Sequence, residues 1–169
     1  YWLKTVPENE ELMILGKSNT NFEKIKPIFI VGVPRCGSTL IEKIIASGNK
    51  NIPIGEETGS IPSCLGEKIS NKKSIIMDIE SLKENIIKKY NDKGLIQEKY
   101  DYIFTDKTLD NFFFIGLIKE IFPKAKIINC KRNITSSITS IIKNNLGDVA
   151  WAHNPENIFK FFDLYLKKI

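Results

Sequence analysis

The chain has 169 residues, of which 42% are hydrophobic and 27% charged, and its formal net charge is +5. It is long enough for one globular domain that needs neither disulfides nor a structural metal, and its three separated cysteines, Cys36, Cys64 and Cys130, predict reduced thiols. The lysines are scattered and no apolar run reaches about 18 residues, so we expect a cytoplasmic protein with no nucleic-acid partner and no membrane span.

Apolar patterning along the chain predicts three cycles of a strand followed by a helix. The expected strands are 28–31, 102–105 and 126–130, and the expected helices are 39–47, 111–122 and 135–144. Such alternation is typical of a right-handed, doubly wound parallel sheet with helices on both faces. The sequence therefore predicts an α/β fold of three layers, α/β/α.

Three segments lie outside these cycles. Residues 1–26 are polar and predict an irregular lead-in, so the domain is expected over 27–169. Residues 60–100 predict an insert whose lysine-rich helix, near 82–90, forms a solvated face or a cap over the substrate. Residues 158–169 keep a helical apolar period up to the end of the sequence, which indicates a domain that is incomplete at its C-terminus.

A glycine-containing loop joins the first expected strand to the first helix and holds Arg35, one of only two arginines in a lysine-rich chain. Such a loop points backbone N–H groups and a helix dipole at a phosphate-like anion, and arginine recognises oxyanions with a planar pair of donors that lysine lacks. The P-loop of kinases has lysine where Ser38 stands, and no expected strand ends in an aspartate suited to magnesium. The loop thus predicts an anion site that does not bind Mg·ATP, with a P-loop-type kinase as the alternative.

The same loop resembles a motif of sulfotransferases that use 3′-phosphoadenosine 5′-phosphosulfate (PAPS). It reads Pro34-Arg35-Cys36-Gly37-Ser38-Thr39-Leu40, where the family has Pro-Arg-Ser-Gly-Thr-Thr-Leu around the 5′-phosphosulfate. Arg132, followed eight residues later by Ser140, resembles the family's 3′-phosphate site. The resemblance implies a P-loop-like sulfotransferase domain that binds PAPS through this loop, Arg132 and Ser140, and that releases 3′-phosphoadenosine 5′-phosphate (PAP) without a metal.

Two further motifs suggest catalytic residues. Gly55-Glu56-Glu57-Thr58 is most similar to tyrosylprotein sulfotransferases and to bacterial sulfotransferases with tetratricopeptide repeats upstream, which would precede this segment in a longer chain. The resemblance implies that Glu57, supported by Glu56, is the general base for the acceptor hydroxyl. Lys107, in the segment after the second strand, and Arg35 would stabilise charge on the sulfuryl group and the leaving phosphate.

The acceptor is not defined by these motifs. Tyrosylprotein sulfotransferases have arginine directly after Gly-Glu-Glu-Thr, where this chain has Gly59, so a protein tyrosine, a glycan and a small alcohol all remain open. Cys36 in place of serine leaves a second alternative, a catalytically inactive nucleotide-binding module. His153 is expected at the surface. The remaining aromatic candidates are expected in the core: Phe112, Phe113, Phe114, Phe159, Phe161 and Phe162.

Overall fold

The computed structural model describes residues 12–15, 24–48, 51–69, 75–144, 146–147 and 149–169. The strands are β1 (Leu12–Leu15), β2 (Lys26–Gly32), β3 (Ile75–Asp78), β4 (Ile103–Asp106) and β5 (Lys126–Cys130). The helices are α2 (Ser38–Ala46), α3 (Ser60–Ile69), α4 (Ile79–Asp92), α5 (Ile115–Ile121), α6 (Ile134–Asn144) and α7 (Pro155–Lys168). Short 3₁₀ helices are η2 (Glu98–Tyr100), η3 (Leu109–Phe114) and η4 (Ala150–His153).

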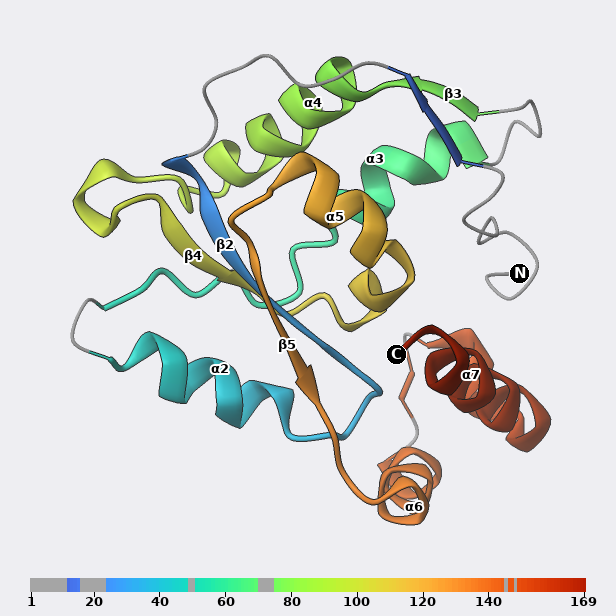
Figure 1. The fold of residues 1–169 in the computed structure, drawn as a ribbon. Coiled ribbons are helices and arrows are strands. Elements are labelled where there is room, and N and C mark those ends of the chain that lie inside the picture. The colour runs from blue at the N-terminus through green and yellow to red at the C-terminus, as the bar shows by residue number, and fades with distance from the viewer. Residues whose placement is uncertain (1–11, 16–23, 49–50, 70–74, 145, 148) are drawn as a thin grey trace.

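A three-stranded parallel sheet with the order β4–β2–β5 forms the centre of the fold (Figure 1). The central strand β2 is buried from Pro27 to Gly32, as expected for a strand covered on both faces. The N–H of Lys26 donates to the Tyr102 carbonyl on the β4 side at 3.1 Å. The missing N–H of Pro27 therefore falls on the opposite side, where pairing with β5 begins only at Ile28. A proline is tolerated in this central strand because no hydrogen bond is lost there.

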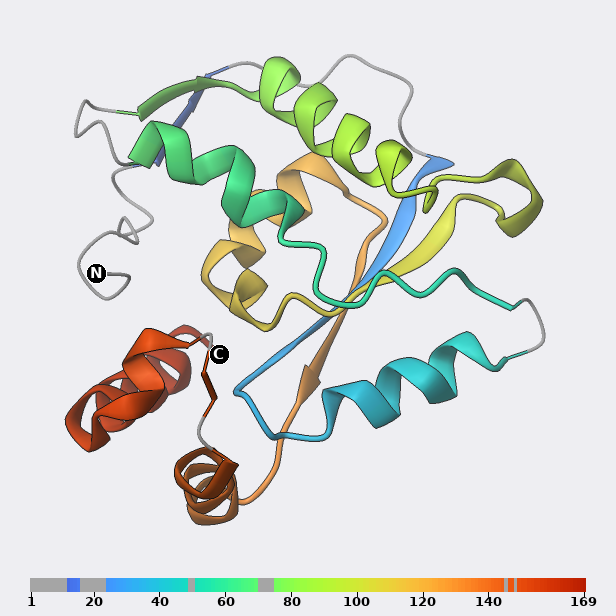
Figure 2. The same cartoon turned by 180° about the vertical axis from the view of Figure 1, so that it is seen from behind.

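Helices cover both faces of the sheet. In both views of the ribbon, the three strands run diagonally between α2 on one side and α3, α4 and α5 on the other (Figures 1 and 2). The α/β class and the parallel sheet predicted from the sequence are confirmed. β5 is found at the predicted residues, whereas α2, β4 and α6 each begin within one residue of the expected start.

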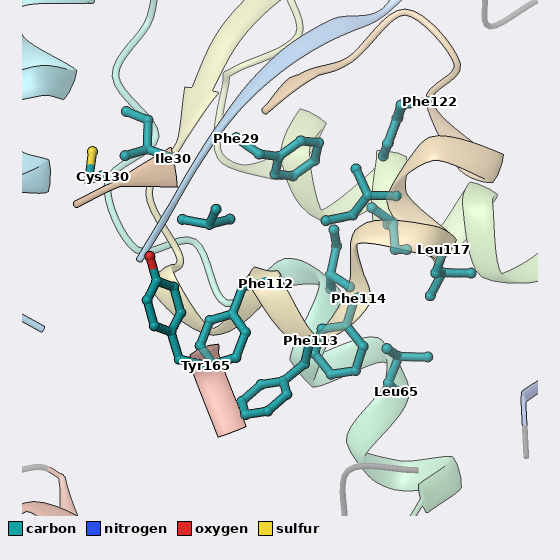
Figure 3. Packing of buried hydrophobic residues seen from close by; sticks show 14 of the residues in the cluster. Phe29, Ile30, Leu65, Phe112, Phe113, Phe114, Leu117, Phe122, Cys130 and Tyr165 are labelled. Atoms are coloured by element: carbon teal, nitrogen blue, oxygen red, sulfur yellow. The ribbon is translucent and has the colours of Figure 1, made fainter. Parts of the chain in front are cut away.

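The core is rich in phenylalanine, as Figure 3 shows. Phe29 of β2 packs on Phe122 with 6.1 Å between ring centroids, and Phe112 meets the ring of Tyr165 edge to face at 5.2 Å. The predicted core phenylalanines are buried with one exception. Phe159 lies on the outer face of α7 and is 56% exposed, so its assignment to the core was wrong.

Residues 60–100 differ most from the sequence prediction. The described residues of this segment form the helices α3 and α4, the strand β3 and the short 3₁₀ helix η2. Helix α4 buries Leu82, Ile86 and Tyr90 in the main core. The segment is therefore part of the domain's central packing rather than a solvated face or a cap. β3 pairs in parallel with β1, so the prediction of an irregular lead-in was wrong for residues 12–15.

The predicted helix at 111–122 is split. Its first part is the 3₁₀ helix η3, in which Asn111, Phe112, Phe113 and Phe114 are all buried, and only the second part, α5, is α-helical. Four consecutive buried residues give no amphipathic period, because η3 contacts β2, α3, α5 and α7 on different sides.

The last helix, α7, is hydrogen-bonded to the sheet. The hydroxyl of Tyr165 on α7 donates to the Asn129 side chain on β5 at 2.6 Å, and α7 also packs on η3 and η4. Asn154 caps α7 by accepting from the N–H of Glu156 at 2.8 Å. None of the helices in the described ranges is long and apolar enough to cross a membrane.

Candidate active site

A cavity of about 610 Å³ lies where the three parallel strands end. Its lining residues come from the loop after β2, from the segment around Glu57 and Gly59, from the segments after β4 and β5, and from the chain between α6 and α7. Ligands of open parallel sheets bind at this carboxyl edge. Eight predicted site residues line the cavity: Pro34, Arg35, Gly37, Ser38, Thr39, Leu40, Glu57 and Arg132.

The loop after β2 has the backbone of an anion site. Arg35 and Gly37 adopt left-handed conformations, with φ of 69° and 97°, and α2 begins directly afterwards at Ser38. Gly37 provides no side-chain cap, so the first N–H groups of α2 remain available to a ligand. Cys36 differs from its neighbours because its side chain is buried in the core and its N–H donates to the Val33 carbonyl at 3.3 Å. Cys36 is therefore not among the residues that line the cavity.

The two arginines of the chain meet at this loop. Nη1 of Arg132 donates to the backbone carbonyl of Arg35 at 3.1 Å, and Nε of Arg35 donates to the Ser140 hydroxyl at 3.0 Å. Ser140 also accepts from the Asn144 side chain at 3.2 Å. The structure thus brings together three of the predicted residues, but Ser140 contacts Arg35 rather than Arg132.

Glu57 and Lys107 form an ion pair at the β4 side of the cavity. Nζ of Lys107 lies 2.7 Å from Oε1 of Glu57. The lysine side chain is 7% exposed and that of Glu57 is 68% exposed. Lys107 is therefore not an ordinary surface lysine, and Glu57 neutralises its buried charge while staying accessible from solvent.

The segment that carries Glu57 is fixed by hydrogen bonds to β4 and α2. The N–H of Glu56 donates to Glu42 at 3.0 Å, and the Thr105 hydroxyl donates to the same carboxylate oxygen at 2.7 Å. The N–H of Lys107 donates to the Glu56 carbonyl at 2.7 Å. Glu56 itself has an exposed side chain and a left-handed φ of 54°. Glu42 was not predicted as a site residue, and its signal in the sequence is its place on the same helical face as Ser38 and Ala46.

β4 ends in an aspartate, contrary to the expectation that no strand does so. Oδ2 of Asp106 accepts from the hydroxyls of Thr58 at 2.7 Å and Tyr90 at 2.6 Å, and Oδ1 accepts from the N–H of Thr108 at 2.8 Å. Burial, followed by the charge of Asp106, raises the pKa of Tyr90. The Asp106 carboxylate therefore holds β4, α4 and the segment that carries Glu57 together by hydrogen bonds. In the described part of the chain, no three His, Cys, Asp or Glu side chains gather to hold a metal ion.

Asp110 is a cavity residue that no motif of the sequence indicated. It lies in η3, is half-buried and lines the cavity together with Glu57. Burial, and secondly the negative charge of Glu57, raise the pKa of Asp110 from 3.8 to about 6. In the sequence, Asp110 is marked only as a polar residue shortly before the phenylalanine run 112–114.

Replacing Gly55 by alanine is expected to destabilise the protein by about 2 to 3 kcal/mol, because overpacking a tight site forces the backbone to move. A Cβ at this position would lie 1.9 Å from the Thr105 carbonyl oxygen. Denaturant unfolding measures the change. The control is Gly66→Ala on α3, where a Cβ meets nothing within 4 Å and a helical alanine stabilises slightly. Equal stability of the two variants would contradict the close approach of Gly55 to β4.

Replacing Asp110 by asparagine is expected to stabilise the protein at pH 7 by about 1 to 2 kcal/mol, after allowing for solvent screening. The raised pKa means that the folded state binds more protons than the unfolded state between pH 3.8 and about 6. The parent therefore loses stability as pH rises through that window, and the variant does not. Urea unfolding at pH 3.5 and pH 7 measures both values. A gain of the same size at both pH values would show that the ionised carboxylate is not its cause.

The structure defines an α/β protein with a P-loop-like loop beside a cavity at the carboxyl edge of its parallel sheet. Residues 27–163 match the sulfotransferase family, and the chain belongs to this family. It is 33% identical over 132 residues to an uncharacterized protein from Aquifex aeolicus (strain VF5), a match that covers 72% of this chain and 17% of that protein. It is 37% identical over 71 residues to protein-tyrosine sulfotransferase 2 from Gallus gallus, covering 40% of this chain and 19% of that protein. The chain thus spans less than a fifth of the length of the curated relatives it matches.

Proposed function

We propose that the chain transfers the sulfuryl group of PAPS to an acceptor hydroxyl and releases PAP. The observation that carries this proposal is the arrangement of charge around one cavity. The Arg132 side chain donates a hydrogen bond to the backbone of Arg35 beside the N-terminus of α2, and Glu57 forms an ion pair with the buried Lys107. The first group suits a nucleotide with two anionic ends, and the second suits the deprotonation of a hydroxyl.

The donor would be held by the loop after β2 and by the two arginines. Backbone N–H groups and the hydroxyls of Ser38 and Thr39 would bind the 5′-phosphosulfate, within a loop shaped by the other residues of its motif. Arg132 would bind the 3′-phosphate with two parallel donors. Ser140 would contribute by orienting the guanidinium of Arg35, to which it is bonded.

The transfer step needs a base and positive charge. The acceptor oxygen attacks sulfur, the bond from sulfur to the bridging oxygen breaks, and PAP leaves with the electron pair of that bond. Glu57 takes the hydroxyl proton on the carboxylate oxygen that is not bound to Lys107, and Glu56 supports the segment through its backbone bonds. Lys107 and Arg35 stabilise the negative charge on the sulfuryl and leaving oxygens. These residues supply the base and the charge without a metal.

The cysteines support action in the cytoplasm. Cys36, Cys64 and Cys130 form no disulfide among the described residues, as is usual for cysteines in a reducing compartment. The kinase alternative gains no support from the site, because Ser38 occupies the position of the P-loop lysine and the oxygens of Asp106 are bound within the fold.

Calorimetric titration with PAP and with ATP·Mg²⁺ tests the donor. We expect PAP to bind with a dissociation constant of about a micromolar or lower, without metal. ATP·Mg²⁺ should bind far more weakly, because ATP has no 3′-phosphate for Arg132 to bind. Tighter binding of ATP·Mg²⁺ would favour the kinase. PAP binding without transfer to any of a panel of labelled acceptors would favour an inactive nucleotide-binding module.

A further inference from the structure

The positive and the negative side chains of the cavity lie at different strands of the sheet. Arg35 and Arg132 follow β2 and β5, whereas Asp110 lies in η3 shortly after β4 and Glu57 is bonded to the lysine that follows β4. Since the strand order is β4–β2–β5, the positive side chains stand at the middle and one edge of the sheet, and the negative ones at the other edge. The cavity therefore has a cationic part and an acidic part.

A charge balance follows for the state with donor bound, which rests on the function proposed above. The two anionic ends of the donor match Arg35 and Arg132, and Lys107 is already matched by Glu57. Among the described cavity-lining residues, the charged group that remains without an opposite partner is the carboxylate of Asp110. An acceptor that enters beside Glu57 thus meets an unmatched negative charge and no unmatched positive one.

The environment of Asp110 makes this imbalance energetically relevant. Its carboxyl is half-buried and lines the same cavity as Glu57. Burial, and secondly the negative charge of Glu57, raise the pKa of Asp110 to about 6. At pH 7 it is still mostly ionised. A positive charge placed near it would relieve the cost of that ionised state, whereas another negative charge would increase it.

Trp151 provides a flat wall of the same cavity. The indole stacks on Phe161 with 4.0 Å between ring centroids and an interplanar angle of 12°. It is half-buried and lines the cavity from η4. A ring fixed from behind in this way offers a rigid surface on which the apolar face of a sugar or an aromatic ring can lie.

We propose that the acceptor is a ring-bearing hydroxyl compound without a negative charge near its hydroxyl, and that Asp110 selects for an amine at that place. Asp110 is thus a specificity-determining residue, and Trp151 forms the wall on which the acceptor ring rests. Acidic peptides and carboxylated sugars would be poor acceptors for this site.

Two acceptor series that differ only in charge test the proposal on the protein saturated with PAP. One series is glucosamine, glucose and glucuronate, and the other is tyramine, tyrosol and 4-hydroxyphenylacetate. Calorimetry measures each dissociation constant, so the test does not depend on turnover. In at least one series we expect the amine to bind about tenfold more tightly than the carboxylate, with the neutral compound between them.

Substitutions test whether Asp110 causes the preference for the amine and whether Trp151 contacts the acceptor ring. Asp110→Asn should reduce the amine-to-carboxylate ratio to about twofold or less, whereas Asp92→Asn, at the exposed end of α4, should keep the parental ratio. Trp151→Ala should weaken all members of the binding series to a similar degree, because the wall contacts the ring and not the charge.

Each remaining outcome would overturn the inference. It fails if the carboxylate binds as tightly as the amine in both series, if the ratio survives Asp110→Asn, or if no compound of either series binds at millimolar concentration. Failure of PAP itself to bind is a different result, since it would remove the proposed donor and hence the function on which this inference rests.

Discussion

Glu57→Gln is expected to lower sulfuryl transfer by about 10²- to 10⁴-fold, the usual effect of removing a general base. The amide can still accept the hydrogen bond that Lys107 makes to Oε1 at 2.7 Å, so the buried lysine keeps a partner. It cannot take the proton of the acceptor hydroxyl. PAP affinity should therefore change little while turnover falls, and initial rates with labelled PAPS combined with PAP calorimetry separate the two effects.

Glu56→Gln is the matched control for this prediction. The Glu56 side chain is exposed, and its structural contacts are made by its backbone N–H and carbonyl, which the substitution leaves in place. We expect a much smaller loss of turnover. If Glu57→Gln keeps near-parental turnover while Glu56→Gln or His153→Ala abolishes it with PAP affinity intact, the base is that other residue.

Arg132→Ala is expected to weaken PAP binding by about 2 to 4 kcal/mol, because the 3′-phosphate would lose a bidentate, charge-assisted partner. Arg132→Lys should recover only part of this affinity, since lysine restores the charge but not the planar pair of donors. Calorimetry on the three proteins measures the difference. The same change removes the hydrogen bond to the Arg35 carbonyl, so Arg35 would be less firmly placed as well.

Lys131→Ala provides the control for this substitution. Lys131 is the exposed neighbour of Arg132 and does not line the main cavity, so its loss should lower PAP affinity only through weak, salt-screened attraction. If Arg132→Ala binds PAP as well as the parent does, the assignment of Arg132 to the 3′-phosphate is wrong.

The parts of the fold that could be predicted are those with a local cause. β2 and β5 are short apolar runs between proline, glycine and basic residues, and these boundaries act on the chain wherever it folds. β1 and β3 could not be predicted because each strand is completed by the other, across a long stretch of sequence. η3 was missed for a related reason, since its packing on several sides removes the period that marks a surface helix.

The site shows the same division. The resemblance was enough to predict that Arg35, Glu57, Lys107 and Arg132 would serve one site, but it did not predict the ion pair between Glu57 and Lys107. The roles of Glu42 and Asp110 depend on partners that only folding brings near, namely the N–H of Glu56 in one case and the Glu57 carboxylate in the other. In the sequence, Asp110 is an ordinary acidic residue, and Glu42 is marked only by its place on the helical face of Ser38 and Ala46.

The strand order has a consequence for how the protein is made. β2, the strand on which both others pair, is synthesised before either of them, since Lys26 pairs with Ile103 and Ile28 with Lys126. Until these partners leave the ribosome, a nearly all-apolar strand has two open edges that other chains can join. Pairing between such distant segments is also slow. The yield of active protein should therefore depend on the rate of translation and on chaperones that shield β2, and not only on the stability of the finished fold.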